Sequence, residues 1–176
     1  MTPESPASKR LRDTACGWLD DPLGVVLDFE TTGLDGYAVE LAVTSMTGAA
    51  LLHHRIYPGH GVVMHPKAEA VHGIRLDDLQ MEPTLADLRL EVSRVLEGAN
   101  VHAYNAPFDR SIWARESERL GDVAVGHPDE WRCIMRLYSE WVGGRDAPWI
   151  RLPGGDHTAL GDCRAALAVL RKVAGR

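Results

Sequence analysis

The sequence predicts a mixed α/β sandwich, in which helices flank a mixed five-stranded sheet. Three early segments carry the β-branched, aromatic or alternating residues typical of strands, and they follow one another closely: residues 24–30, 38–46 and 49–57. Beyond them, segments of helical periodicity alternate with two short apolar segments, a pattern that indicates strand–helix units on one sheet. The length of 176 residues suits one domain of this kind.

The first half of the chain is expected to supply an antiparallel meander of three strands. Residues 1–7 are expected to be a loose tail and residues 8–20 a short helix. We therefore divide the chain into an N-terminal tail and helix, residues 1–23, and a main domain, residues 24–176. A loop and a pair of short helical turns are expected to follow the strands, at residues 58–66 and 67–80.

The second half is predicted to alternate helices and strands. Thr84 and Asp87 resemble a capping box at the start of a helix, residues 85–97, and Gly98 ends it. The next expected elements are a strand, a helix, a strand that passes into a helix ending near residue 142, a glycine- and proline-rich loop and a last helix: residues 101–104, 106–120, 131–135, 143–156 and 158–174.

Composition excludes several classes of protein. Lysine and arginine number 19 against 25 acidic residues, and a net charge of −6 argues against a protein that coats duplex nucleic acid through a basic face. It does not exclude a nuclease that grips one strand end through bound cations. Three cysteines without a CxxC pair argue against a disulfide framework. No apolar stretch approaches the roughly 18 residues that span a bilayer, so no membrane partner and a cytoplasmic location are expected.

Two acidic residues end the first strand. Side chains alternate along a strand, so Asp28 and Glu30 project to the same face, roughly 6–7 Å apart at the backbone. Adjacent carboxylates repel each other, and a divalent cation such as Mg²⁺ or Mn²⁺ would turn that repulsion into attraction. The alternative is a strand that ends in solvated acids.

Two further acids stand in unusual places. Asp162 falls inside the broad apolar face of the last helix, where a carboxylate needs a metal or a hydrogen-bonding partner, unless it is a partly exposed acid near the helix start. Asp109 follows a short strand, in the opening turn of a helix for which Asn105 is a natural N-cap. His157 closes the long loop five residues before Asp162, and the pKa of histidine suits a general base near neutrality.

The three motifs in this order and spacing resemble those of the DEDDh exonuclease family. They are Asp28-x-Glu30-Thr-Thr-Gly, Asn105-x-x-Phe-Asp109 and His157-x-Ala-x-x-Asp162. That family includes the epsilon subunit of bacterial DNA polymerase III, oligoribonuclease and ribonuclease T. Residues 71–74 also resemble the stretch between its first two motifs, whereas Tyr104 stands where many members carry histidine.

The resemblance implies a ribonuclease H-like fold and 3′-to-5′ exonuclease activity on single-stranded DNA or RNA. It implies two Mg²⁺ or Mn²⁺ ions held by four carboxylates, with His157 as the general base that activates water: Asp28, Glu30, Asp109 and Asp162. It also implies a set of residues that receive the 3′ end of the strand: Thr31, Gly33, Leu34, Asn105 and Phe108. A polymerase or repair complex is a possible setting, and the oligomeric state stays open.

Two other interpretations remain at this stage. A nucleic-acid-binding relative that has lost catalysis would share the motifs, although all four acids and the histidine are present. His127-Pro128-Asp129 could supply part of the two-histidine, one-carboxylate site of a non-haem iron oxygenase. That class needs a double-sheet barrel, and the helices predicted after residue 83 argue against such a barrel.

Overall fold

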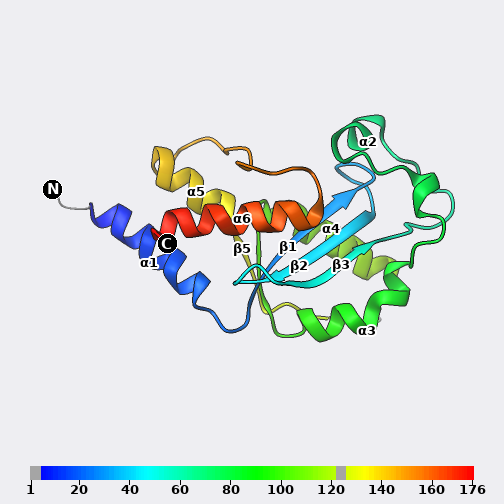
Figure 1. The fold of residues 1–176 in the computed structure, drawn as a ribbon, viewed down its shortest axis with the longest axis horizontal. Helices are drawn as coiled ribbons and strands as arrows, with labels where there is room; N and C mark the ends of the chain where they lie inside the picture. The colour runs from blue at the N-terminus through cyan, green and yellow to red at the C-terminus, as the bar shows by residue number, and fades with distance from the viewer. Residues whose placement is uncertain (1–4, 122–125) are drawn as a thin grey trace.

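The strands form one mixed sheet in the order β3-β2-β1-β4-β5 (Figure 1). The computed structural model describes residues 5–121 and 126–176. The five strands are β1 (Gly24–Thr31), β2 (Ala38–Ser45), β3 (Ala50–Arg55), β4 (Asn100–Ala103) and β5 (Glu130–Cys133). Strands β1, β2 and β3 pair antiparallel, while β4 is parallel to both β1 and β5. The predicted meander and mixed five-stranded sheet are confirmed.

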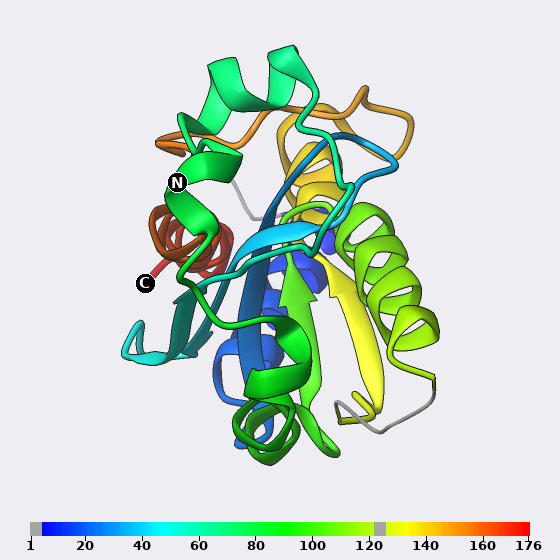
Figure 2. The same cartoon turned by 90° about the vertical axis from the view of Figure 1, so that its right-hand side faces the viewer.

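Helices cover both faces of this sheet. The helices are α1 (Pro6–Leu19), α2 (Pro66–His72), α3 (Leu85–Leu96), α4 (Ala106–Arg119), α5 (Ile134–Gly143) and α6 (Ala159–Ala174), with a 3₁₀ turn η1 (Leu76–Leu79) after α2. Apolar side chains of α1, α5 and α6 pack in one core, and those of α3 and α4 in a second core on the opposite face. Figure 2 shows α6 and α4 on the two sides of the sheet.

Strand β1 lies at the centre of the sheet and is buried on both faces. Val25, Leu27 and Phe29 belong to the core under α3 and α4, whereas Val26 belongs to the core under α6. The strict alternation of a strand therefore turns Asp28 toward α6. The arrangement matches the alternation expected from the sequence.

Helix boundaries agree with the sequence in most places. Helix α1 begins at Pro6, two residues earlier than expected, because the Ser5 side chain accepts a hydrogen bond from the Ser8 amide and Pro6 suits the first turn. Residues 1–4 of the expected tail lie outside the described residues. The predicted capping box of Thr84 and Asp87 is present. Among the described residues, no helix has the length and apolar content to cross a membrane.

Candidate active site

Three acidic side chains gather where β1 and β2 lie side by side. Asp28 is partly buried, Glu30 is buried, and Glu40 of β2 is the cross-strand partner of Glu30. Like charges directly opposite each other destabilise a sheet, so three acids at one place need another source of stability. Glu40 was not among the residues predicted from the sequence, although a single charged residue within the apolar run of β2 was an available signal.

Helix α4 delivers Asp109 to the same place. Its side chain is only 2% exposed, and the backbone amides of Phe29 and of Asp109 itself oppose the rise in its pKa that burial causes. Within the described residues, its Oδ1 atom has no hydrogen-bond partner. Because β1 and β4 run parallel, the end of β1 and the start of α4 meet at one edge of the sheet.

The start of α6 brings Asp162 and His157 together. The Asp162 Oδ1 atom accepts hydrogen bonds from the amides of Asp156, at 2.9 Å, and His157, at 3.2 Å. His157 has a left-handed backbone with φ of 60°, which is uncommon for a residue with a side chain and turns its amide toward the carboxylate. Ligand atoms of Glu30, Asp162 and the His157 ring then lie within 4.8 Å of one another.

Glu40 and Asp156 fix this end of α6. The Glu40 Oε2 atom accepts a hydrogen bond from the Ala159 amide at 2.8 Å. The Asp156 Oδ1 atom accepts from the amide and the hydroxyl of Thr158. Gly161 leaves the space that Asp156 occupies, because a Cβ atom there would lie 2.0 Å from Asp156 Oδ1. The position of Asp162 is therefore set by contacts to β2 and to the preceding loop.

The electrostatics of the site favour a bound cation. Burial, reinforced by the neighbouring carboxylates, raises the pKa of Glu30 to about 8, and burial raises the pKa of Asp109 to about 8. Burial also raises the pKa of Asp28 well above its ordinary value and raises the pKa of Asp162. Oxygen ligands of this kind suit Mg²⁺ and Mn²⁺, and the unpartnered Asp109 Oδ1 is free to bind one. The residues present fit a divalent metal site.

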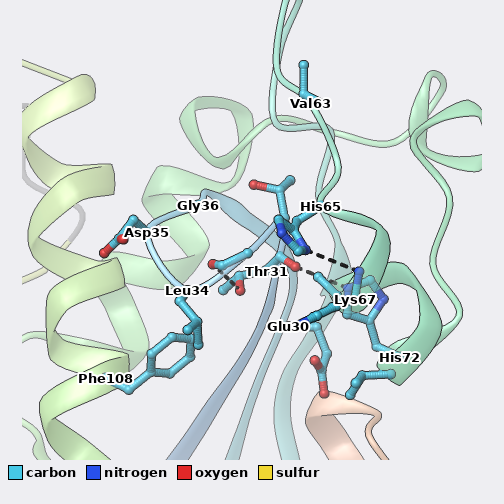
Figure 3. A pocket seen from close by; sticks show the side chains of 14 residues that line it. Glu30, Thr31, Leu34, Asp35, Gly36, Val63, His65, Lys67, His72 and Phe108 are labelled. Carbon is cyan, nitrogen blue, oxygen red and sulfur yellow. Dashed lines mark hydrogen bonds between the residues drawn. The ribbon is translucent and has the colours of Figure 1, made fainter.

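A pocket of about 790 Å³ opens beside the carboxylates (Figure 3). Leu34 and Phe108 lie on one side of it, and His65, Lys67 and His72 on the other. His72 Nε2 lies 3.1 Å from the Thr31 carbonyl oxygen, a contact that ties α2 to the end of β1. This volume lies within the range of small-molecule sites.

Four of the five residues expected to receive the 3′ end of the nucleic acid line this pocket, and one does not. Thr31, Gly33, Leu34 and Phe108 line it, whereas Asn105 is not among its lining residues. Asn105 also differs from the expected N-cap, because its side chain makes no capping hydrogen bond to α4 and its Oδ1 atom is buried without a partner among the described residues. The part of the pocket wall that α2 forms was not predicted from the sequence; its only signal was the resemblance of residues 71–74 to the family.

Residues 25–170 match the RNase_T family, described as exonuclease. The match covers most of the chain and includes every carboxylate described above. The chain belongs to this exonuclease family. The predicted membership of the DEDDh exonucleases is confirmed, and the protein is a nuclease, a hydrolase that acts on nucleic acids.

The exonuclease is similar to one curated protein and to several solved structures. It is 28% identical to the uncharacterized exonuclease CP81 of Escherichia phage 186, over 89% of this chain and 90% of that protein. It resembles Exonuclease X in complex with 5′-overhanging duplex DNA, with a TM-score of 0.59 and 24% identity over 87% of this chain and 93% of that one. It also resembles E. coli Exonuclease I in complex with a dA16 oligonucleotide, with a TM-score of 0.66 and 14% identity over 85% of this chain.

These structural similarities establish the ribonuclease H-like fold. The match spans only 40% of the Exonuclease I chain, so it concerns one part of that protein. The fold excludes the iron-oxygenase alternative, because that class needs a double-sheet barrel and the strands within residues 5–121 and 126–176 form one mixed sheet. His127 and Asp129 precede β5 and lie at the amino end of the parallel strands, away from the carboxylates.

Proposed function

We propose that the protein is a 3′-to-5′ exonuclease that releases nucleoside 5′-monophosphates from the 3′ end of single-stranded DNA or RNA. The observation that carries this proposal is the convergence of acids from β1, α4 and α6, with His157, at the edge of a pocket of about 790 Å³. The DNA ligands of the similar structures support a nucleic acid substrate. The order of the three motifs supports the 3′-to-5′ direction.

Two divalent cations, Mg²⁺ or Mn²⁺, would be held by four carboxylates: Asp28, Glu30, Asp109 and Asp162. When bound, such ions supply positive charge that stabilises the negative charge developing on the phosphoryl and leaving oxygens. In their absence the raised pKa values of Glu30 and Asp109 hold protons at the site. The carboxylates therefore exchange protons for metal as the site fills.

His157 is suited to the proton transfer that hydrolysis requires. As water attacks the phosphorus, its proton passes to the imidazole, and the bond from phosphorus to the 3′ oxygen of the penultimate nucleotide breaks. That oxygen leaves as a 3′-hydroxyl after taking up a proton, and the terminal nucleotide leaves as a 5′-monophosphate. Asp162 positions the base, because its carboxylate accepts the His157 amide hydrogen bond.

The pocket explains why cleavage would begin at a strand end. Backbone from Thr31 to Leu34 and the ring of Phe108 line the space next to Glu30, where the terminal nucleotide would lie. Asn105 lies at the start of α4, outside the pocket wall, and would contact the nucleic acid from there. The division into residues 1–23 and the exonuclease domain, residues 24–176, remains part of this proposal.

The decisive experiment compares end-labelled single-stranded DNA, single-stranded RNA and dinucleotides, each with a free or a blocked 3′-hydroxyl. We expect stepwise release of 5′-monophosphates from free 3′ ends with Mg²⁺ or Mn²⁺, and none in excess EDTA. Asp28→Asn is the matched inactive control, because it removes one charge and keeps the side-chain shape. Internal cleavage of 3′-blocked strands would contradict the proposal, and binding without any release would instead favour a relative that has lost catalysis.

A further inference from the structure

An arginine from the long loop contacts the proposed general base. The Arg151 Nη2 atom lies 2.7 Å from the His157 Nε2 atom. A guanidinium group only donates hydrogen bonds, so the imidazole Nε2 atom is the acceptor in this contact. The lone pair that would take the proton from water is therefore occupied by Arg151 in this structure.

The loop holds Arg151 at this position through both of its neighbours. The Ile150 carbonyl oxygen accepts a hydrogen bond from the Tyr104 hydroxyl at 2.7 Å, and the Ile150 amide donates to the Ser139 hydroxyl at 3.3 Å. Leu152 packs against the core formed by α1, α5 and α6. Because Ile150 and Leu152 face inward, the intervening Arg151 side chain is exposed and directed to the site.

Tyr104 is the residue whose hydroxyl holds the Ile150 carbonyl oxygen in this loop. It stands where many members of the family carry histidine, and its side chain is buried with 7% exposure. Its hydroxyl reaches across 46 residues of chain to the loop that carries Arg151. Tyr104, which departs from the family pattern, is thus hydrogen-bonded to the residue that precedes Arg151.

The charge of the surroundings indicates the ligand that Arg151 would take. The Arg151 guanidinium is a cation held at the edge of the site, and the proposed substrate is a polyanion whose scissile phosphate would enter there. Arginine pairs with two phosphate oxygens at once and holds them more strongly than it holds a neutral imidazole. A phosphate entering the site would therefore draw the guanidinium away from His157.

We propose that Arg151 binds the scissile phosphate and, in the free enzyme, covers the accepting nitrogen of His157, so that substrate binding exposes the base. This inference rests on the proposed function. It makes Arg151 a substrate-binding residue and Tyr104 a positioning residue that acts through the loop. The base is then available only when a phosphate is present to be cleaved.

The test compares Arg151→Ala and Arg151→Lys with Arg145→Ala, which removes an exposed arginine from the same loop. Each is assayed on a single-stranded oligonucleotide and on the p-nitrophenyl ester of thymidine 5′-monophosphate, whose only phosphate is the scissile one. We expect Arg151→Ala to raise KM about 10- to 100-fold on both substrates, the usual value of a charge-assisted hydrogen bond, with kcat changed much less. Arg151→Lys should recover part of this loss, and Arg145→Ala should stay within about twofold of the wild type.

Binding provides a readout that does not depend on turnover. Calorimetric titration with thymidine 5′-monophosphate in Mg²⁺ should show an affinity about 10- to 100-fold lower for Arg151→Ala than for the wild type. Unchanged KM and unchanged affinity in Arg151→Ala would overturn the inference while wild-type activity upholds the proposed function. A defect confined to the oligonucleotide would overturn the assignment to the scissile phosphate. Wild type inactive on both substrates would overturn the proposed function and this inference with it.

A double-mutant cycle tests the link to Tyr104. Tyr104→Phe removes only the hydroxyl that holds Ile150, so we expect it to raise KM in the same direction as Arg151→Ala and by less. In the Arg151→Ala background the same change should have almost no further effect on KM, because the residue it positions is gone. Fully additive effects on KM would overturn the positioning role of Tyr104.

Discussion

Helix α4 carries two buried acids on one face, and the protein treats them differently. Glu116 is fully buried, its Oε1 atom accepts a hydrogen bond from the Ala38 amide at 2.9 Å, and its Oε2 atom lies 2.9 Å from Arg119 Nη2. Asp109 lies two turns earlier and is 2% exposed. Glu116 Oε2 and Asp109 Oδ1 both lack a hydrogen-bond partner among the described residues, but only Glu116 forms an ion pair with an arginine there. One carboxylate is neutralised by the chain itself, and the other is not.

The difference separates a structural acid from a functional one. Burial raises the pKa of both carboxylates, and Arg119 and the Ala38 amide oppose this rise at Glu116. At Asp109 the neighbouring charge comes from Asp162, which raises the pKa further. A buried acid surrounded by acids is costly unless a cation or a proton joins it. The region around Glu116 is complete as folded, and we propose that a bound cation completes the region around Asp109.

The largest effect is expected from removing the charge of Asp109. Asp109→Asn should lower exonuclease turnover by about 10⁴-fold or more, because a ligand of the proposed metal site is lost. It should leave the free energy of unfolding unchanged or higher, since one of several repelling charges disappears. Single-turnover assays with urea unfolding of the same sample check both. Retention of turnover would show that Asp109 resembles Glu116 after all.

A second large effect distinguishes the base from the ligands. His157→Ala should lower turnover by about 10²–10⁴-fold, the usual contribution of a positioned base. The rise of Tm on adding Mn²⁺ should persist in this variant and should be absent in Asp109→Asn. Turnover against pH, with thermal melts in Mn²⁺ and in EDTA, makes the comparison. Loss of the Mn²⁺ effect in His157→Ala would make the histidine a ligand.

The stability of the metal-free protein should depend on pH through the unpaired acids. Glu30 and Asp109 have folded-state pKa values of about 8, above their unfolded values, so their contribution is complete below about pH 4 and is lost as pH rises through about 8. In EDTA we expect Tm to fall by about 5–10 °C between pH 5 and pH 9. Mg²⁺ should restore Tm mainly at the higher pH. In Asp109→Asn the fall of Tm with pH in EDTA should be smaller. An equally large fall in this variant would show that Asp109 is not its cause.

The smallest effect on activity is expected at Glu116. Glu116→Gln keeps the acceptor for Ala38 and removes the charge that pairs with Arg119, so it should cost about 1–2 kcal/mol of stability and lower Tm by a few degrees. Exonuclease turnover and the response of Tm to Mn²⁺ should stay within about twofold of the wild type. Activity lost in proportion to that in Asp109→Asn would remove the distinction between the two acids.

Local pattern in the sequence was enough to predict a large part of the fold and most of the proposed site. The alternation along β1, the capping box of Thr84 and the apolar face of α6 all depend on neighbours within a few residues. Such neighbours are related by the fixed geometry of one strand or one helix. The start of α1 differs from the expected start by two residues, because the Ser5 side chain caps the helix and Pro6 occupies its first position.

The sequence by itself was enough to predict which side chains would carry the proposed chemistry: the acids of β1, the start of α4 and the start of α6, with His157 before it. Only the tertiary structure decided how they are held. Glu40 reaches the Ala159 amide across 119 residues, and Tyr104 reaches Ile150 across 46. These contacts depend on the order of strands in the sheet and on the path of a loop without any repeating backbone geometry. No local periodicity encodes such contacts, so Arg151 at the nitrogen of His157 could be found only in the folded chain.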